Sequence, residues 1–130
     1  MNEAELKQRT KAFGLRVLKL IDALPESRSG RVLVGQLGRS ATSVGANYRA
    51  ACRSHSTAEM ISKLAVVEEE ADESAFWLEM MGEHGLVSAA QLESLLQEAH
   101  ELTAITVASR RTLSRQREQS KIENPKSKIR

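Results

Sequence analysis

The sequence contains few of the residues that interrupt or cross-link a chain. Its two prolines are Pro25 and Pro125, so the long stretch between them lacks the strongest helix breaker. The single cysteine, Cys52, excludes an internal disulfide, and a chain without disulfides is typical of a reducing compartment. These features favour long helices and predict a cytoplasmic protein.

Aromatic residues and long apolar runs are also scarce. The aromatic residues are Phe13, Tyr48, Phe76 and Trp77. A core for this chain must therefore be aliphatic and rich in alanine, which suits closely packed helices. No run of about 18 apolar residues occurs, so we expect no membrane span. The acidic residues 1–5 lack the apolar centre of a secretory signal. A chain of 130 residues is expected to form one domain.

Small residues are abundant, and they gather around residues 39–48. Between residues 35 and 51 they are Gly35, Gly38, Ser40, Ala41, Ser43, Gly45, Ala46, Ala50 and Ala51. Glycine costs a helix about 1 kcal/mol relative to alanine, so glycines here require tertiary packing that compensates for them. The stretch therefore predicts a crowded contact between helices. Polar residues within that contact, such as Arg39, need partners.

Apolar residues recur at helical spacing in four segments, and no alternating strand pattern occurs. We predict helices at about 3–24, 31–53, 57–81 and 89–114. Capping boxes begin three of them: Asn2 with Glu5, Ser56 with Glu59, and Ser88 with Gln91. The short connections predict an all-α, antiparallel up-down four-helix bundle in residues 1–115.

The second predicted helix has core positions that step alternately by four and three residues. These positions are Leu33, Leu37, Ser40, Val44, Asn47 and Ala51. Ser40 and Asn47 are polar, and buried polar residues in such a seam can fix its register. Because a short turn follows, residues whose numbers sum to about 110 should face each other. We therefore expect an Arg39–Glu70 ion pair and a contact between Val44 and Val67.

Charge is placed unevenly along the chain. The net charge of +2 combines +6 on residues 110–130, which hold eight bases and two acids, with −4 on residues 1–109. Helical periodicity fails past Arg115, so we predict that residues 116–130 form a disordered basic tail. A basic tail on an acidic body is typical of proteins that bind polyanions, although a merely solvated tail has the same composition.

Residues with chemical potential do not form a recognisable active site. The histidines His55, His84 and His100 have no glutamate three residues before them, so the Glu-x-x-His pattern of di-metal bundles is missing. Cys52 lies near His55, but no orienting acid or oxyanion donor accompanies the pair. The glycines lie along a predicted helix, so no phosphate-binding loop is expected. We predict no catalytic residue, no metal and no cofactor.

The run Gly35–Arg49, with the sequence GQLGRSATSVGANYR, resembles the signature of a bacterial family known as four helix bundle proteins or ribosomal-RNA intervening-sequence proteins. The resemblance continues at Ser56, 61–64, 70–74, 77–79 and 102–105, and spans about residues 12–113. The residues that we assign to this structural motif are Arg39, Ser40, Ser43, Gly45, Asn47, Tyr48, Glu70 and Trp77.

The resemblance implies a small bundle, encoded in or associated with an insertion in a ribosomal RNA gene, that assembles as a homopentamer and has no defined biochemical activity. A similar family is the accessory variability protein of diversity-generating retroelements. Its members are basic pentamers that associate with nucleic acid and a reverse transcriptase. This chain departs from the pattern at Ala50, where glutamate is common, and at Glu68 and Glu69, where the helix is usually more basic.

Two hypotheses of different classes follow, and neither is an enzyme. The first is a homopentamer that binds RNA or other nucleic acid weakly and without sequence preference. Its candidate residues are Arg110, Arg111, Arg115, Arg117, Lys7, Lys11 and Arg16. The second is an oligomeric scaffold that docks a protein partner, such as a reverse transcriptase, through the acidic residues 68–70. Stacking on bases is not expected, because Tyr48 and Trp77 should pack between helices.

Overall fold

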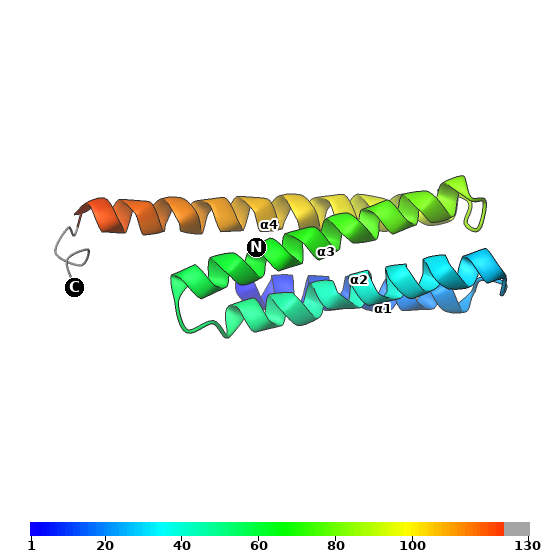
Figure 1. Cartoon of the computed structure of the whole chain (residues 1–130), viewed down its shortest axis with the longest axis horizontal. Helices are drawn as coiled ribbons and strands as arrows, with labels where there is room; N and C mark the ends of the chain where they lie inside the picture. The colour runs from blue at the N-terminus through cyan, green and yellow to red at the C-terminus, as the bar shows by residue number, and fades with distance from the viewer. Residues whose placement is uncertain (124–130) are drawn as a thin grey trace.

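The computed structural model describes residues 1–123, and within them the chain is all-α. The helices are α1 (Glu3–Asp22), α2 (Arg28–Cys52), α3 (Thr57–Glu83) and α4 (Ala89–Glu123). Each helix runs antiparallel to the one before it (Figure 1). The predicted up-down four-helix bundle is confirmed.

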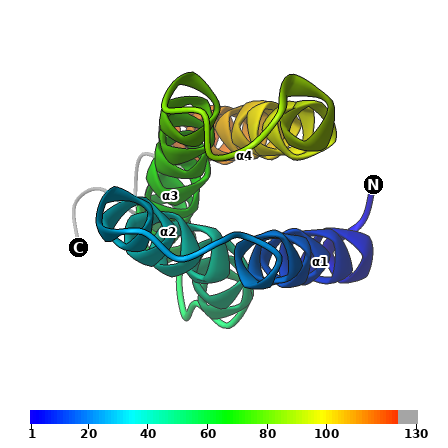
Figure 2. The same cartoon turned by 90° about the vertical axis from the view of Figure 1, so that its right-hand side faces the viewer.

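The four helices follow one another in an open arc when the bundle is viewed end-on (Figure 2). α2 packs against both α1 and α3, and α3 packs against α4. α1 and α4 also touch, but far less extensively than the pairs of consecutive helices. Long polar side chains connect α1 with α4. Arg9 forms ion pairs with Glu98 and Glu101 at 2.6 and 2.9 Å, and Arg16 donates to Ser94 Oγ at 2.7 Å. These ion pairs raise the pKa of Arg9 above its ordinary value, with the hydrogen bond to Glu98 as the largest cause.

Side-chain caps set the helix starts. Asn2 and Ser56 accept hydrogen bonds from the backbone of Glu5 and Glu59, at 2.8 and 3.1 Å, as predicted. The start of α2 was predicted too late, at residue 31. Ser27 caps this helix through a 3.0 Å bond from Gly30 N, so the helix begins at Arg28.

The C-terminal end of α4 differs most from the prediction. The helix continues to Glu123, although residues 116–123 were predicted as disordered tail. Glutamine, arginine, glutamate and lysine are good helix formers, and no breaker occurs before Pro125. Local pairs add support, including Lys121 with Glu118 at 3.8 Å and Gln119 with Glu123 at 2.7 Å. Residues 124–130 of the predicted tail lie outside the described residues.

The core draws apolar side chains from all four helices. The largest fully buried ones are Phe13, Val17, Leu37, Val44, Leu64, Val67, Leu78, Met81 and Leu102. The seam predicted for α2 is buried at Leu33, Leu37, Ser40, Val44 and Ala51. Asn47 is the exception, because it is half-buried and its amide donates to Ser43 O of its own helix at 2.8 Å. Tyr48 takes the buried position instead, as its predicted packing between helices requires.

Candidate functional site

The predicted nucleic-acid residues fall into a group on α4 and a group on α1. On α4, Arg110 is partly buried and its Nε lies 2.8 Å from Glu68 Oε2, so this guanidinium already serves the α3–α4 contact. Arg111, Arg115 and Arg117 are exposed, and none of them pairs with a carboxylate among residues 1–123. These three arginines remain available to a polyanion.

The exposed bases near the end of α4 lie on two of its faces. Arg111 and Arg115 are four residues apart and share one face, while Arg117 and Lys121 share another. No described residue after Leu113 is buried, and α4 continues past the α2–α3 connection in Figure 1. The segment therefore offers positive charge in several directions, without a single shaped patch.

The basic residues predicted on α1 are less uniform. Arg16 is bonded to Ser94 of α4, and Lys7 pairs with Glu3 at 3.5 Å along its own helix. Lys11 is exposed and has no ion pair within residues 1–123. The structure therefore leaves Lys11 as the most available base of this group.

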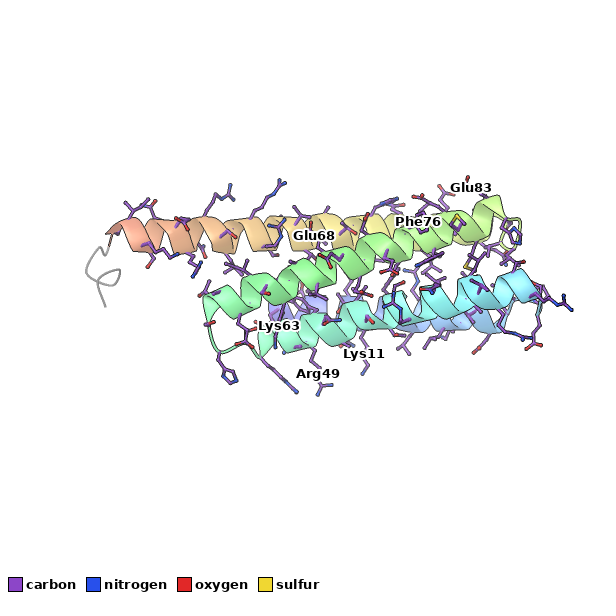
Figure 3. All side chains as sticks on the ribbon, viewed as in Figure 1. Lys11, Arg49, Lys63, Glu68, Phe76 and Glu83 are labelled. Carbon is purple, nitrogen blue, oxygen red and sulfur yellow. The ribbon has the colours of Figure 1, made fainter. Side chains whose placement is uncertain are left out.

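A groove of about 460 Å³ lies along the outer junction of α1 and α2. Its floor is formed by small residues, including Gly14, Gly45 and Ala46, and its remaining lining residues are Lys7, Gln8, Thr10, Lys11, Leu15, Leu18, Thr42 and Arg49. Figure 3 shows Lys11 and Arg49 projecting from the same edge of the bundle. Arg49, Leu15 and Leu18 were not among the predicted site residues. In the sequence, the two leucines could have been noticed because they lie outside the apolar stripe that α1 buries.

Signature residues form a polar cluster where α2 meets α3. Arg39 Nη1 lies 3.6 Å from Glu70 Oε2, so the predicted pair exists. The shorter contact, 2.7 Å, joins Arg39 Nη2 to Glu73 Oε1, which also accepts a 3.1 Å hydrogen bond from Trp77 Nε1. Trp77 is half-buried and Phe76 is exposed. Their two rings pack edge to face, with centroids 4.9 Å apart.

Glu70 is the more buried carboxylate of this cluster. Its Oε2 is buried and accepts no hydrogen bond from any described residue. Burial raises the pKa of the Glu70 carboxyl, Arg39 acts in the opposite direction, and the nearby Glu73 and Glu69 raise the pKa further. Because Arg39 donates a 2.7 Å hydrogen bond to Glu73 and lies 3.6 Å from Glu70 without a hydrogen bond, the cluster holds Arg39 chiefly through Glu73.

Cys52 has the environment of an unreactive thiol. It is half-buried, and burial raises its pKa above the ordinary value. Burial also raises the pKa of its neighbour Tyr48 above the ordinary value, and Cys52 raises it further. His55 is exposed, and its backbone N–H donates to Glu59 at 3.2 Å. The arrangement offers no activated nucleophile at Cys52.

Among residues 1–123, no group of three or more histidine, cysteine, aspartate and glutamate side chains is placed to hold a metal ion. No helix in this part of the chain combines the length and the apolar character that crossing a membrane requires.

Comparison with known proteins agrees with the fold. A crystal structure from Bacteroides thetaiotaomicron, described as a protein with unknown function from the S23 ribosomal protein family, is 29% identical and superposes with a TM-score of 0.79. The similarity covers 85% of this chain and 99% of that one. No curated protein matches. Residues 2–108 match the family described as 23S rRNA-intervening sequence protein, and the chain belongs to that family.

Proposed function

We propose that this chain is a non-enzymatic, homo-oligomeric bundle that binds RNA electrostatically and without sequence preference. The observation that carries the proposal is the exposed end of α4, where Arg111, Arg115 and Arg117 have no carboxylate partner within residues 1–123. The family resemblance leads us to expect five copies. The lone Cys52 and an RNA target suit the cytoplasm.

A helical segment presents its arginines differently from a disordered tail. The helix fixes the spacing of the guanidinium groups before binding, so less side-chain and backbone freedom is lost on contact. Several copies in one particle would raise the avidity for a long polyanion without any new contact. Binding of this kind weakens steeply with salt, because each phosphate contact releases a counterion.

The experiment measures RNA binding by fluorescence anisotropy over a range of KCl concentrations. The test variant combines Arg111→Gln, Arg115→Gln and Arg117→Gln in the full chain. For single-stranded RNA we expect the slope of log K against log salt to fall by about 2 per bound copy, and the affinity at low salt to fall at least tenfold.

The matched control removes the same charge elsewhere. Arg28→Gln, Arg31→Gln and Arg53→Gln alter three exposed arginines near the ends of α2. The control should retain most of the wild-type affinity. If both triple variants lose affinity equally, binding reflects net charge alone and the α4 segment is not the site.

A second candidate is an oligomeric scaffold that docks a protein such as a reverse transcriptase without touching nucleic acid. It is favoured by Glu69 and Asp72, which are exposed on α3 and have no ion pair among the described residues. Of the predicted acidic residues 68–70, only Glu69 is available in this way, because Glu68 pairs with Arg110 and Glu70 faces Arg39. Wild-type protein that fails to bind RNA even at low salt would favour this candidate.

A further inference from the structure

The geometry points to a head-to-tail interface in which the α1–α2 groove of one copy receives an exposed ridge of α3 from the next copy. The groove presents Lys7, Lys11, Leu15, Leu18 and Arg49. The ridge presents Val66, Glu69, Phe76 and Met80. This inference rests on the self-association in the proposed function and names the surfaces that would carry it.

The α3 ridge exposes large apolar side chains that the bundle does not use. Phe76 is 50% exposed, and Val66 and Met80 are each 39% exposed. With Glu69 they lie on the outer side of α3, away from the buried residues Leu64, Val67, Ala71, Ser74 and Leu78. An aromatic ring and a methionine on one exposed stripe are typical of a protein contact surface.

The groove offers complementary chemistry on different helices. Leu15 and Leu18 are 53% and 41% exposed, although the adjoining floor is built from glycine and alanine. Lys7, Lys11 and Arg49 make one end of the groove basic. The groove can therefore receive both a large apolar side chain and a carboxylate. Figure 3 shows that Lys11 and Arg49 project from the edge formed by α1 and α2, whereas Phe76 lies on α3.

The order of charge and apolar residues matches along the two helices. On α1 the bases Lys7 and Lys11 come before Leu18, and on α3 the acid Glu69 comes before Met80. The step from Lys7 to Leu18 equals the step from Glu69 to Met80, eleven residues, or about 16 Å of helix. Parallel alignment therefore sets carboxylate against ammonium and apolar against apolar. Antiparallel alignment would set Glu69 against Leu18.

The topology of the bundle supplies that parallel direction. In an up-down bundle α1 and α3 of one chain run the same way, as Figure 1 shows. A rotation about an axis along the bundle preserves this direction, so α3 of a rotated copy stays parallel to α1 of its neighbour. The two surfaces are different patches of the chain, which makes the contact heterologous. Repeating a heterologous contact closes a ring where the rotation divides a full turn, and it builds an open filament otherwise.

The test uses one variant on each surface, Phe76→Glu and Leu15→Glu, with mass measured by size-exclusion chromatography and light scattering. Each variant alone should be a monomer with a wild-type circular dichroism spectrum, because both side chains are exposed in the bundle. Each variant keeps one intact surface. A 1:1 mixture should therefore form a dimer. Ile122→Glu, an exposed apolar residue of α4 outside both surfaces, should retain the wild-type mass.

The outcomes separate the interface from self-association itself. If either single variant keeps the wild-type mass, or if the mixture stays monomeric, the two surfaces do not meet and the inference is overturned while self-association stands. A monomeric wild type at 50 μM or above would overturn both. A second arm tests the alignment: Lys7→Glu should raise the dissociation constant at least tenfold, and adding Glu69→Lys in the same chain should restore most of the affinity. If the second substitution fails to restore the affinity, the parallel alignment is contradicted.

Discussion

Helix α2 meets its two neighbours in different ways. Against α1 it brings backbone close to backbone, since a Cβ built on Gly45 would lie 3.3 Å from Lys11 N and from Thr10 O. Gly14 makes the reciprocal approach, with its Cβ position 3.4 Å from Ala41 O. Against α3 the same helix uses side chains, because Ser40 and its neighbours fill the seam and bond across it.

The difference shows two ways of holding a helix in register. A backbone-to-backbone crossing is limited by size, because even a methyl group requires the other helix to move. A side-chain seam tolerates changes of size that its neighbours can absorb, and it depends instead on whether its polar groups keep partners. Substitutions on the two sides of α2 should therefore fail for different reasons and by different amounts.

The largest expected effect is on the α1–α2 side. Gly45→Leu places a bulky side chain against the backbone of α1, and we expect the free energy of unfolding to fall by about 3 kcal/mol, the upper end for overpacking. Urea denaturation followed by circular dichroism measures this loss. On heating, the variant should lose its helical circular dichroism signal at a lower temperature than wild type.

Gly35→Leu is the matched control on the same helix. A Cβ at Gly35 meets nothing within 4 Å, so only helix propensity changes, and stability should rise by up to about 1 kcal/mol. Equal effects from the two glycine substitutions would remove the contrast between a size-limited crossing and an ordinary helix surface.

A smaller effect is expected in the α2–α3 seam. Ser74 Oγ lies 3.1 Å from Ser40 Oγ, and both side chains are fully buried. Each hydroxyl also contacts a carbonyl of its own helix, Leu37 O at 3.2 Å or Glu70 O at 2.8 Å. Because that local bond survives in the partner, Ser40→Ala or Ser74→Ala alone should cost about 1 kcal/mol.

The double variant measures whether the two serines act as a pair. We expect a coupling of about 0.5 kcal/mol, so that Ser40→Ala with Ser74→Ala costs less than the sum of the single losses. Thermal and urea unfolding of the four proteins provide the cycle. Strict additivity would mean that the serines only fill space and do not fix the register of the seam.

The four-helix fold was predicted from the sequence, but the buried residue near position 47 was predicted wrongly. Helical spacing and the caps at Asn2 and Ser56 predicted the helices because these signals are local. Strict stepping by four and three residues placed Asn47 in the core. The buried face of α2 is wider than that seam on one side, where Ala41 and Tyr48 are buried, and Asn47 lies at its opposite edge.

The contacts between helices were predicted less well, because spacing along one helix does not say which neighbour faces each side. The small residues were assigned to a single crowded contact, whereas Gly45 serves α1 and Ser40 serves α3. Similarly, Arg39 was matched with Glu70 by residue number. A long guanidinium also reaches one turn further, and there it meets Glu73 at 2.7 Å. Arg110 could not be matched with Glu68 without knowing how α3 lies on α4.

The smallest expected effect concerns the ion pairs of Arg39 between α2 and α3. Glu73→Gln removes the close ion pair with Arg39, whose side chain is 54% exposed, and should lower stability by about 0.5 kcal/mol at pH 7. Glu70→Gln should leave stability unchanged or raise it, because it removes a carboxylate whose ionised form is disfavoured by burial.

The pH dependence of these two variants gives the decisive measurement. The pKa of Glu70 is raised in the folded state, so folding is favoured by protonation of this carboxyl and its penalty is fully present at neutral pH. As the pH falls through the raised pKa toward the unfolded value of about 4.3, wild type should gain stability relative to Glu70→Gln. Urea unfolding at pH 7, 5.5 and 4.5 tests this convergence. A Glu70→Gln variant that is less stable than Glu73→Gln at pH 7 would mean that Glu70, rather than Glu73, holds Arg39 against α3.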